Sequence, residues 1–214
     1  MNIIEPKYEI LTNYTPEAVY RQIETAGRTC YKSESKITAD SARKFVAGIV
    51  KHGHEAMLEH AQLSVRFTVD RGVSHEIVRH RVASYAQEST RYCNYSKKQF
   101  GGEITVIKPT FFEEGTESYE VWKKSCEEAE KAYFRLLEIG ALPEEARTVL
   151  PNSLKTEIVM TANMREWRHF LSLRAAGTTG TPHPQMREVA MPMLMELAEK
   201  LPEIFGDIAE RAKR

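Results

Sequence analysis

Alternating apolar and polar residues over 62–69 give the clearest structural pattern in the chain. A strict period of two is typical of a strand with one buried face. The apolar positions that share this face are Leu63, Val65, Phe67 and Val69. Two further segments, 103–109 and 153–162, are also predicted to be strands.

Helical spacing of apolar residues predicts several helices between these strands. Thr15 before Pro16 is a helix start, because a hydroxyl can cap free backbone N–H groups and proline fits the first turn. Asn163 is a second candidate cap, and Gly140 and Gly177 are candidate helix ends. The predicted helices cover 16–26, 39–51, 116–139, 163–177 and a last stretch from about 184 in which Met191, Met193 and Met195 fill the core.

The segment after the first strand is predicted to turn at residues 70–72 and then to form a helix. Val73, Ile77 and Val78 have helix-compatible spacing. The basic stretch that starts at Arg79 therefore begins on a helix and continues past its end.

These elements indicate the fold class. The sequence has no repeat, no low-complexity tract and no Pro/Gly/Ser-rich linker. We therefore expect a single compact α/β (α+β) domain over residues 1–214, with a small mixed or antiparallel sheet flanked by helices.

Composition narrows the function classes. The chain has 214 residues, of which 42% are hydrophobic and 28% charged, and thirty basic residues balance thirty acidic ones. Zero net charge gives no general attraction to nucleic acid or to an anionic membrane. No apolar run reaches the length of a membrane span and no targeting segment is evident, so a cytoplasmic location is expected. Cys30, Cys93 and Cys126 lack the spacing of a disulfide framework or a zinc site.

The stretch RHRVASYAQESTRY, residues 79–92, is the first candidate for chemistry. Successive side chains on a helix are about 100° apart, so Arg79, His80 and Arg81 would reach more than one ligand group. Ser89 and Arg91 add a hydroxyl and a planar fork of donors that suit a phosphomonoester or a carboxylate. The alternative is that these arginines are solvated residues that favour the C-terminal end of a helix dipole.

The stretch HGHEAMLEH, residues 52–60, has the residue types of a metal site, but their spacing does not fit one. A zincin helix places its second histidine four positions after the first, and position 58 is Leu. We therefore expect no metal, and instead a polar cavity lined by His54 and Glu59. The chain also lacks both glycine-rich phosphate-binding motifs and any activated nucleophile, so a bound nucleotide would be held by arginines.

A second basic cluster supports nucleotide binding. Arg147 lies in one segment, and Arg165, Arg168, His169 and Arg174 lie in another. Arg165 and His169 are four apart and share a helix face. Arg174 points elsewhere and serves a different ligand or none, and both Arg168 and Arg174 have structural alternatives as solvated or helix-end residues.

Five segments in register resemble the flavin-dependent thymidylate synthases. Arg79-His80-Arg81, followed seven residues later by Ser89, is similar to the signature of that family. The resemblance extends over nearly the whole chain through HGHEAMLEH at 52–60, ARTVLP at 146–151, NMREWRHFLSLR at 163–174 and HPQMRE at 183–188.

The resemblance implies a homotetramer with active sites shared between chains, each holding FAD, dUMP and a folate. It implies that NADPH reduces the flavin, that 5,10-methylenetetrahydrofolate supplies the carbon, and that dUMP becomes dTMP. An arginine fixed beside the uracil ring would stabilise charge that develops when C5 acts as a nucleophile. The alternative function is a nucleic-acid or anion-binding module that uses the basic 79–91 segment.

The same resemblance assigns roles to individual residues. Arg174 is the expected catalytic group, and Arg91 and Arg147 are expected near the dUMP phosphate. His54 is expected on the folate and NADPH side of the pocket. The expected dUMP-binding residues are Glu76, Arg79, Gln87, Glu88, Ser89, Thr90, Arg91, Arg147 and Arg174, of which Gln87, Ser89 and Arg91 come from the neighbouring chain. The expected FAD-binding residues are Glu59, Arg79, His80, Arg81, Gln87, Asn163, Arg165 and His169.

Three positions depart from the family pattern. Ala56 stands where Thr or Ser is common, His169 where Asn is common, and Gln87 where Glu is sometimes found. A flavin contact at position 56 would therefore use the backbone. None of the three removes a group that the chemistry needs.

Overall fold

A computed structural model describes residues 1–213, which form two compact units. Unit 1 contains Met1–Lys7, Phe67–Arg79 and Tyr85–Val159. Unit 2 contains Tyr8–Arg66, His80–Ser84 and the chain from Met160 to the last described residue. The single domain over 1–214 stays a prediction.

The strands form two sheets. The larger has the strand order β2 (Lys7–Ile10), β3 (Gln62–Asp70), β6 (Lys155–Asn163), β4 (Ala83–Gln87). In the smaller sheet β1 (Asn2–Ile4) pairs in parallel with β5 (Thr105–Ile107). The strands predicted at 62–69, 103–109 and 153–162 are confirmed as β3, β5 and β6. The four apolar side chains on one face of β3 are fully buried, as the period of two requires.

The sequence analysis missed β1, β2 and β4. All three are short, and β4 has the sequence ASYAQ, in which no side chain is fully buried. A strand without a buried apolar face has no alternating pattern to detect. The mixed α/β class with helices around small sheets is nevertheless confirmed.

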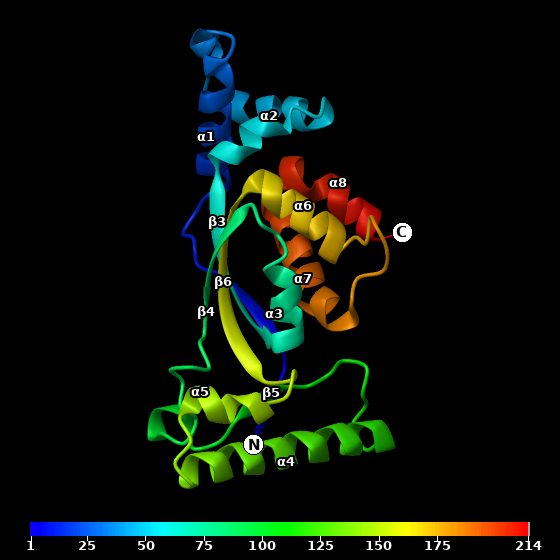
Figure 1. The fold of residues 1–214 in the computed structure, drawn as a ribbon. Coiled ribbons are helices and arrows are strands. Elements are labelled where there is room, and N and C mark those ends of the chain that lie inside the picture. The colour runs from blue at the N-terminus through cyan, green and yellow to red at the C-terminus, as the bar shows by residue number, and fades with distance from the viewer. Residues whose placement is uncertain (214) are drawn as a thin grey trace. The chain divides into compact units, whose positions relative to one another are not determined.

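The helices of unit 2 are α1 (Pro16–Thr29), α2 (Ser41–Lys51), α6 (Met164–Arg174), α7 (Pro184–Lys200) and α8 (Pro202–Ala212). Helices α6, α7 and α8 pack against one another (Figure 1). The predicted helix from 184 is therefore two helices, because Leu201 leaves the helical conformation and Pro202 starts the next helix. Met193 is buried as predicted, but Met195 is 38% exposed and does not fill the core. No helix among residues 1–213 is long and apolar enough to cross a membrane.

Unit 1 contains α3 (Arg71–Ile77), α4 (Glu117–Glu138) and α5 (Pro143–Ala146). The Thr116 hydroxyl accepts a hydrogen bond from the Tyr119 backbone N–H and so caps α4. Cys126 and Tyr133 on α4 are buried in a core with Ile104, Val106 and Leu154. Gly140 follows the helix with φ of +99°, which favours glycine.

The start and the end of α3 correct two sequence predictions. Asp70 does not begin a turn: its side chain accepts a hydrogen bond of 2.8 Å from the Val73 backbone N–H and caps the helix. The helix ends at Ile77, so Arg79, His80 and Arg81 lie beyond it. The 100° separation of helical side chains therefore does not decide where these three residues point.

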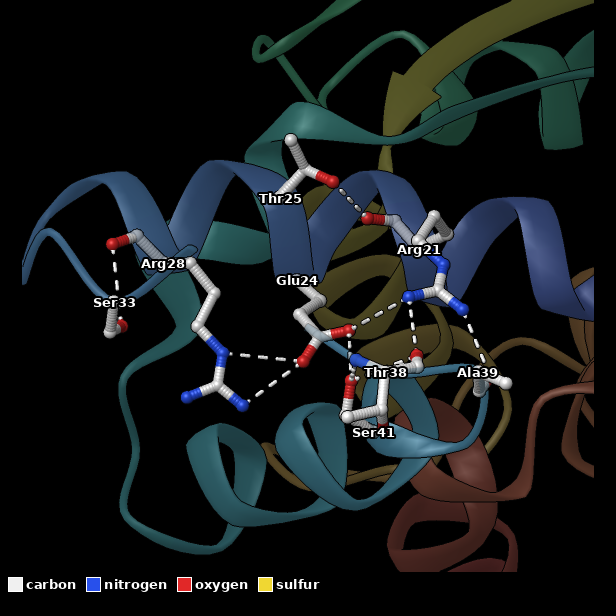
Figure 2. Close-up of polar contacts among 8 residues, drawn as sticks. All are labelled: Arg21, Glu24, Thr25, Arg28, Ser33, Thr38, Ala39 and Ser41. Atoms are coloured by element: carbon white, nitrogen blue, oxygen red, sulfur yellow. Dashed lines mark hydrogen bonds and ion pairs between the residues drawn. The ribbon is translucent and has the colours of Figure 1, made fainter. Parts of the chain in front are cut away.

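A buried carboxylate fixes the connection between α1 and α2. Glu24 is fully buried, and its carboxylate accepts hydrogen bonds from Arg28 at 3.1 and 3.2 Å and from the Ser41 hydroxyl at 2.9 Å (Figure 2). Arg21 lies 3.5 Å from the same carboxylate and also donates to the backbone carbonyls of Thr38 and Ala39. A buried charge is costly unless it is paired, so these contacts hold the 33–41 segment against α1.

Candidate functional site

A cavity of about 580 Å³ opens in unit 2 beside the first turns of α6; we call it the α6 cavity. Arg165 and His169 both line it, as their separation of four residues on a helix predicts. Glu59 lines it too, whereas His54 is exposed, with its ring 6.1 Å from that of His52. The full lining is Glu55, Glu59, Val82, Asn163, Arg165, Glu166, Arg168, His169, Ser172 and Arg211.

The α6 cavity is suited to an anionic ligand. Asn163 caps α6 by accepting a hydrogen bond of 2.9 Å from the Glu166 backbone N–H, so the positive end of the helix dipole faces the cavity. Arg165 donates to Glu59 at 2.6 Å, and both side chains are about half exposed. An exposed ion pair contributes only about 0–1 kcal/mol, so a ligand phosphate can replace the Glu59 carboxylate at little cost.

Arg168 has a structural role. Its guanidinium makes two hydrogen bonds to Asp207, at 2.7 and 3.0 Å, and another of 3.0 Å to Glu55. It also donates to the backbone carbonyl of Ile204. The side chain is only 8% exposed, so Arg168 holds α6 to α8 and to the 3₁₀ segment Glu55–His60. The sequence alternative of a solvated or helix-end arginine is therefore wrong for Arg168, because its side chain is buried in the middle of α6.

His80 lies buried in unit 2 between Glu166 and Arg174. Its Nδ1 is 3.1 Å from a Glu166 carboxylate oxygen, and its Nε2 is 3.2 Å from Arg174 Nε. Burial, the Arg174 guanidinium and His169 together lower the pKa of His80 to about 4. Burial also raises the pKa of Glu166. His80 is therefore neutral near pH 7, and its contact with Glu166 is a hydrogen bond rather than an ion pair.

The segment 87–91 in unit 1 brings two arginines together. Arg91 Nε lies 3.3 Å from the Glu144 carboxylate, and Arg147 Nε donates to the Glu144 backbone carbonyl at 3.2 Å. Arg147 also donates to the Thr90 hydroxyl at 3.3 Å. The Ser89 hydroxyl accepts a hydrogen bond from the Arg91 backbone N–H. Two guanidinium groups and two hydroxyl groups thus gather at one place, which suits a phosphomonoester.

Glu88 and Gln87 face other groups of unit 1. The Glu88 carboxylate lies 2.7 Å from Lys155 Nζ and accepts a hydrogen bond of 3.1 Å from the Tyr95 hydroxyl. The Gln87 side-chain amide donates to the Ser74 hydroxyl at 3.0 Å and to the Thr156 hydroxyl at 3.3 Å. These contacts anchor the start of the 87–91 segment to its surroundings.

Comparison with known proteins identifies the family. Residues 10–203 match the family model described as thymidylate synthase complementing protein. The flavin-dependent thymidylate synthase of Pyrococcus abyssi is 37% identical over 172 residues, which cover 79% of this chain and 68% of the relative. The chain belongs to the flavin-dependent thymidylate synthase family.

Further comparisons agree with this assignment. The family member from Pyrococcus furiosus is 34% identical over 202 residues, covering 89% of this chain and 78% of the relative. Among solved structures, the UMP/dUMP methylase PolB from Streptomyces cacaoi bound with 5-Br dUMP has a TM-score of 0.76 at 22% identity. The match covers 100% of this chain and 97% of that chain, and it shows a shared fold.

The structure brings together part of each residue set that the family resemblance assigns. Of the flavin set, Glu59, Asn163, Arg165 and His169 line the α6 cavity. Of the dUMP set, Ser89, Thr90, Arg91 and Arg147 gather around Glu144. Of the remaining residues, Arg79 and Arg81 are exposed, and Glu76 is half-buried on α3.

Three important groups were missed in the sequence. Glu166 bonds His80 across 86 positions of the chain, and Lys155 bonds Glu88 across 67. Glu144 contacts Arg91 across 53 positions. Glu166 is also the third residue after the cap Asn163. At this position a carboxylate usually bonds a free N–H group of its own helix. No spacing rule connects such distant positions, so these pairs could not be predicted from local patterns.

Proposed function

We propose that this chain methylates dUMP to dTMP, with 5,10-methylenetetrahydrofolate as carbon donor and with FAD that NADPH reduces. Family membership supports the reaction class. The structural observation that carries the proposal is the approach of Arg91 and Arg147 to Glu144, because two guanidinium groups from distant segments converge where a nucleotide phosphate is expected. The alternative from the sequence, a nucleic-acid or anion-binding module, does not account for the family membership.

The residues of the α6 cavity fit a flavin dinucleotide. A pyrophosphate needs cations that can leave their present partners, and the half-exposed Arg165 paired with Glu59 is such a cation. The N-terminus of α6 adds backbone N–H groups, and His169 adds an exposed imidazole. Bound FAD would supply the hydride that completes the methyl group. The residues that would hold FAD are Glu59, Asn163, Arg165 and His169.

The 87–91 segment would hold dUMP by its phosphate. Arg91 carries a planar fork of donors, and its bond with Glu144 is half exposed, so a phosphate can take the place of that carboxylate. Arg147 donates to the Thr90 hydroxyl, which is a further polar contact at this place. Glu88 would act here indirectly, because Lys155 and Tyr95 hold its carboxylate.

Arg174 would act on the uracil ring. When C5 becomes a carbon nucleophile, negative charge develops on the ring oxygens and N3. A guanidinium held in place beside them stabilises that charge more in the transition state than in the ground state. Arg174 is held at its Nε by His80, which is itself buried.

Three finer assignments remain part of the proposal. The enzyme would be a homotetramer with active sites shared between chains, and Gln87, Ser89 and Arg91 would serve the neighbouring chain. His54, exposed beside His52, would lie on the folate and NADPH side of the pocket. Glu76, Arg79 and Arg81 would complete the nucleotide and flavin sites. A cytoplasmic location is also proposed, on the basis of the cysteine pattern.

Flavin binding gives a direct test of this function. Purified protein reconstituted with FAD should show the flavin absorbance bands after gel filtration. Arg165→Ala should weaken FAD binding by about 10- to 100-fold, since a charge-assisted hydrogen bond contributes about 1.5–3 kcal/mol. Arg135→Ala is a matched control, because Arg135 is an exposed arginine of α4 whose guanidinium lies 3.1 Å from the Glu138 carboxylate. Wild-type protein that cannot retain FAD would contradict the proposal.

A further inference from the structure

His80 connects a buried carboxylate to the arginine proposed for catalysis. Its ring is 5% exposed and Glu166 is 8% exposed, so water competes little for either group. One ring nitrogen bonds Glu166 at 3.1 Å and the other bonds Arg174 at 3.2 Å. The three side chains therefore form a hydrogen-bonded chain in the order Glu166, His80, Arg174.

The partners of the ring decide which nitrogen carries the proton. The Nε of an arginine always bears a hydrogen and has no acceptor, so His80 Nε2 must accept and cannot itself be protonated. A neutral imidazole then carries its hydrogen on Nδ1, which donates to the Glu166 carboxylate. Both bonds are present together only in this tautomer.

Neighbouring rings fix the orientation of the imidazole. The Phe170 ring meets it edge-on with 4.8 Å between centroids, and the His169 ring is tilted at 5.6 Å. Glu166 and Phe170 both lie on α6, four residues apart, so one helix supplies the hydrogen-bond acceptor and the packing surface. The direction of the Nε2 lone pair is thereby set by α6.

The cluster of His80, Glu166 and His169 could alternatively be interpreted as a metal site. Ligand atoms of His80, Glu166 and His169 lie within 4.8 Å of one another, and two histidines with a carboxylate suit several divalent cations. A cation on Nε2 would occupy the position of Arg174. A cation on Nδ1 would leave a protonated Nε2 facing the Arg174 N–H, which is repulsive. The guanidinium therefore favours a positioning role over metal binding.

We propose that Glu166 is a positioning residue that sets the tautomer and orientation of His80, and that His80 in turn holds the Arg174 guanidinium for its action on the pyrimidine ring. This inference rests on the proposed function of Arg174. Glu166 itself contacts no reacting atom in this proposal. An equivalent arrangement, a carboxylate that fixes a histidine tautomer, is common where one imidazole nitrogen must accept a bond in a defined direction.

Kinetics of the FAD-loaded enzyme give the first test. Glu166→Ala should lower kcat for dTMP formation by about 10-fold or more, the effect of one lost hydrogen bond, and leave KM for dUMP within about 3-fold. Glu166→Gln should restore most of the rate, because its amide oxygen accepts the same Nδ1 hydrogen. Glu166 lines the α6 cavity, where FAD is proposed to bind. Each rate is therefore divided by the amount of bound FAD, so that a change in FAD binding is not counted as a change in kcat. Glu138→Ala, on the exposed surface of α4, is the control that should keep wild-type kinetics.

The tautomer of His80 gives the second test and needs no activity. In the imidazole ¹⁵N spectrum of the full chain without ligands, the ring whose signals disappear in His80→Gln should be protonated at Nδ1. Glu166→Ala removes the acceptor of the Nδ1 hydrogen, so the Nε2–H form with Arg174 turned away becomes accessible and the ring should become a tautomer mixture. Glu166→Gln should preserve the Nδ1–H form. If Glu166→Ala does not fold, Glu166→Asp takes its place, because its shorter side chain withdraws the acceptor.

The two tests separate failure of this inference from failure of the proposed function. Wild-type protein that forms no dTMP would contradict the proposed function, while the ¹⁵N spectrum still reports the hydrogen-bonded chain. A His80 ring protonated at Nε2 in the wild type would overturn the inference. So would a Glu166→Ala variant with wild-type kcat in an enzyme that forms dTMP.

Discussion

The guanidinium of Arg91 lies against the carboxylate of Glu144, with 3.3 Å between Nε and Oε2. Arg147 bonds the backbone carbonyl of the same residue. An acidic side chain thus occupies the neighbourhood in which both arginines are expected to meet the dUMP phosphate. The ion pair is half exposed, so it contributes little to stability and is readily exchanged.

This arrangement predicts a phosphate-specific loss of binding. Arg91→Ala and Arg147→Ala should each weaken dUMP binding by about 10- to 100-fold, because each removes a charge-assisted hydrogen bond. Binding of deoxyuridine, which lacks the phosphate, should change little in either variant. Isothermal titration with both ligands measures the difference. Equal losses for dUMP and deoxyuridine would show that the arginines act on the fold instead.

The position of Arg174 predicts an effect on turnover. Arg174→Ala should reduce kcat for dTMP formation by about 100-fold or more, the scale seen when a preorganised charge-stabilising donor is removed. KM for dUMP should stay within about 3-fold, because the interaction is strongest in the transition state. Steady-state kinetics at several dUMP concentrations separate the two effects. Unchanged turnover would remove Arg174 from this role.

Burial of His80 predicts a pH dependence of stability. Its pKa is about 4 in the folded protein, against an ordinary value of 6.5. Between pH 6.5 and 4 the unfolded chain binds a proton that the folded protein does not. The contribution of His80 to the free energy of unfolding is therefore fully present above pH 6.5 and is lost as the pH falls toward 4. The shift corresponds to roughly 3 kcal/mol at most.

Chemical denaturation at pH 7 and pH 4.5 tests this prediction. The stability of wild-type protein should fall more between these two conditions than that of His80→Gln, which cannot titrate. Acidic groups away from His80 contribute equally to both proteins, so the difference is attributed to His80 together with the Glu166 carboxylate that bonds it. The same pH dependence in the two proteins would mean that His80 is not buried in its neutral form.

The contacts of Glu24 predict its contribution to stability. Glu24→Ala should lower the free energy of unfolding by about 2–3 kcal/mol, because it removes a buried charge partner and strands the Arg28 guanidinium, which is 18% exposed. Glu24→Gln should cost less, since its amide oxygen still accepts hydrogen bonds. Glu138→Ala, which breaks an exposed pair, should change stability by less than about 1 kcal/mol. Comparable losses for Glu24→Ala and Glu138→Ala would contradict this account.

Local patterns predicted most of the regular structure. Strand β3 was evident because its four apolar residues must share one buried face, and α4 was evident from its apolar stripe and from Gly140 at its end. The α6 cavity was partly predictable, because Arg165 and His169 are one turn apart on a helix with a clear N-cap. These features depend on residues close together in sequence.

Features that depend on tertiary contacts were not predictable in the same way. The helical spacing of Val73, Ile77 and Val78 extended α3 too far, because it gave no sign that the helix ends at Ile77. Strand β4 has no buried apolar face, so its place at the sheet edge is decided by pairing with β6. The bonds of His80 to Glu166 and of Arg91 to Glu144 join distant segments, and only the folded chain brings them together.

The proposed reaction turns dUMP into dTMP with a flavin as hydride carrier. The most direct measurement incubates the FAD-loaded protein with dUMP, 5,10-methylenetetrahydrofolate and NADPH and follows dTMP by chromatography. We expect dTMP to increase with time, to require all three substrates and to be absent when FAD is removed. Absence of dTMP from protein that is folded and fully loaded with FAD would contradict it.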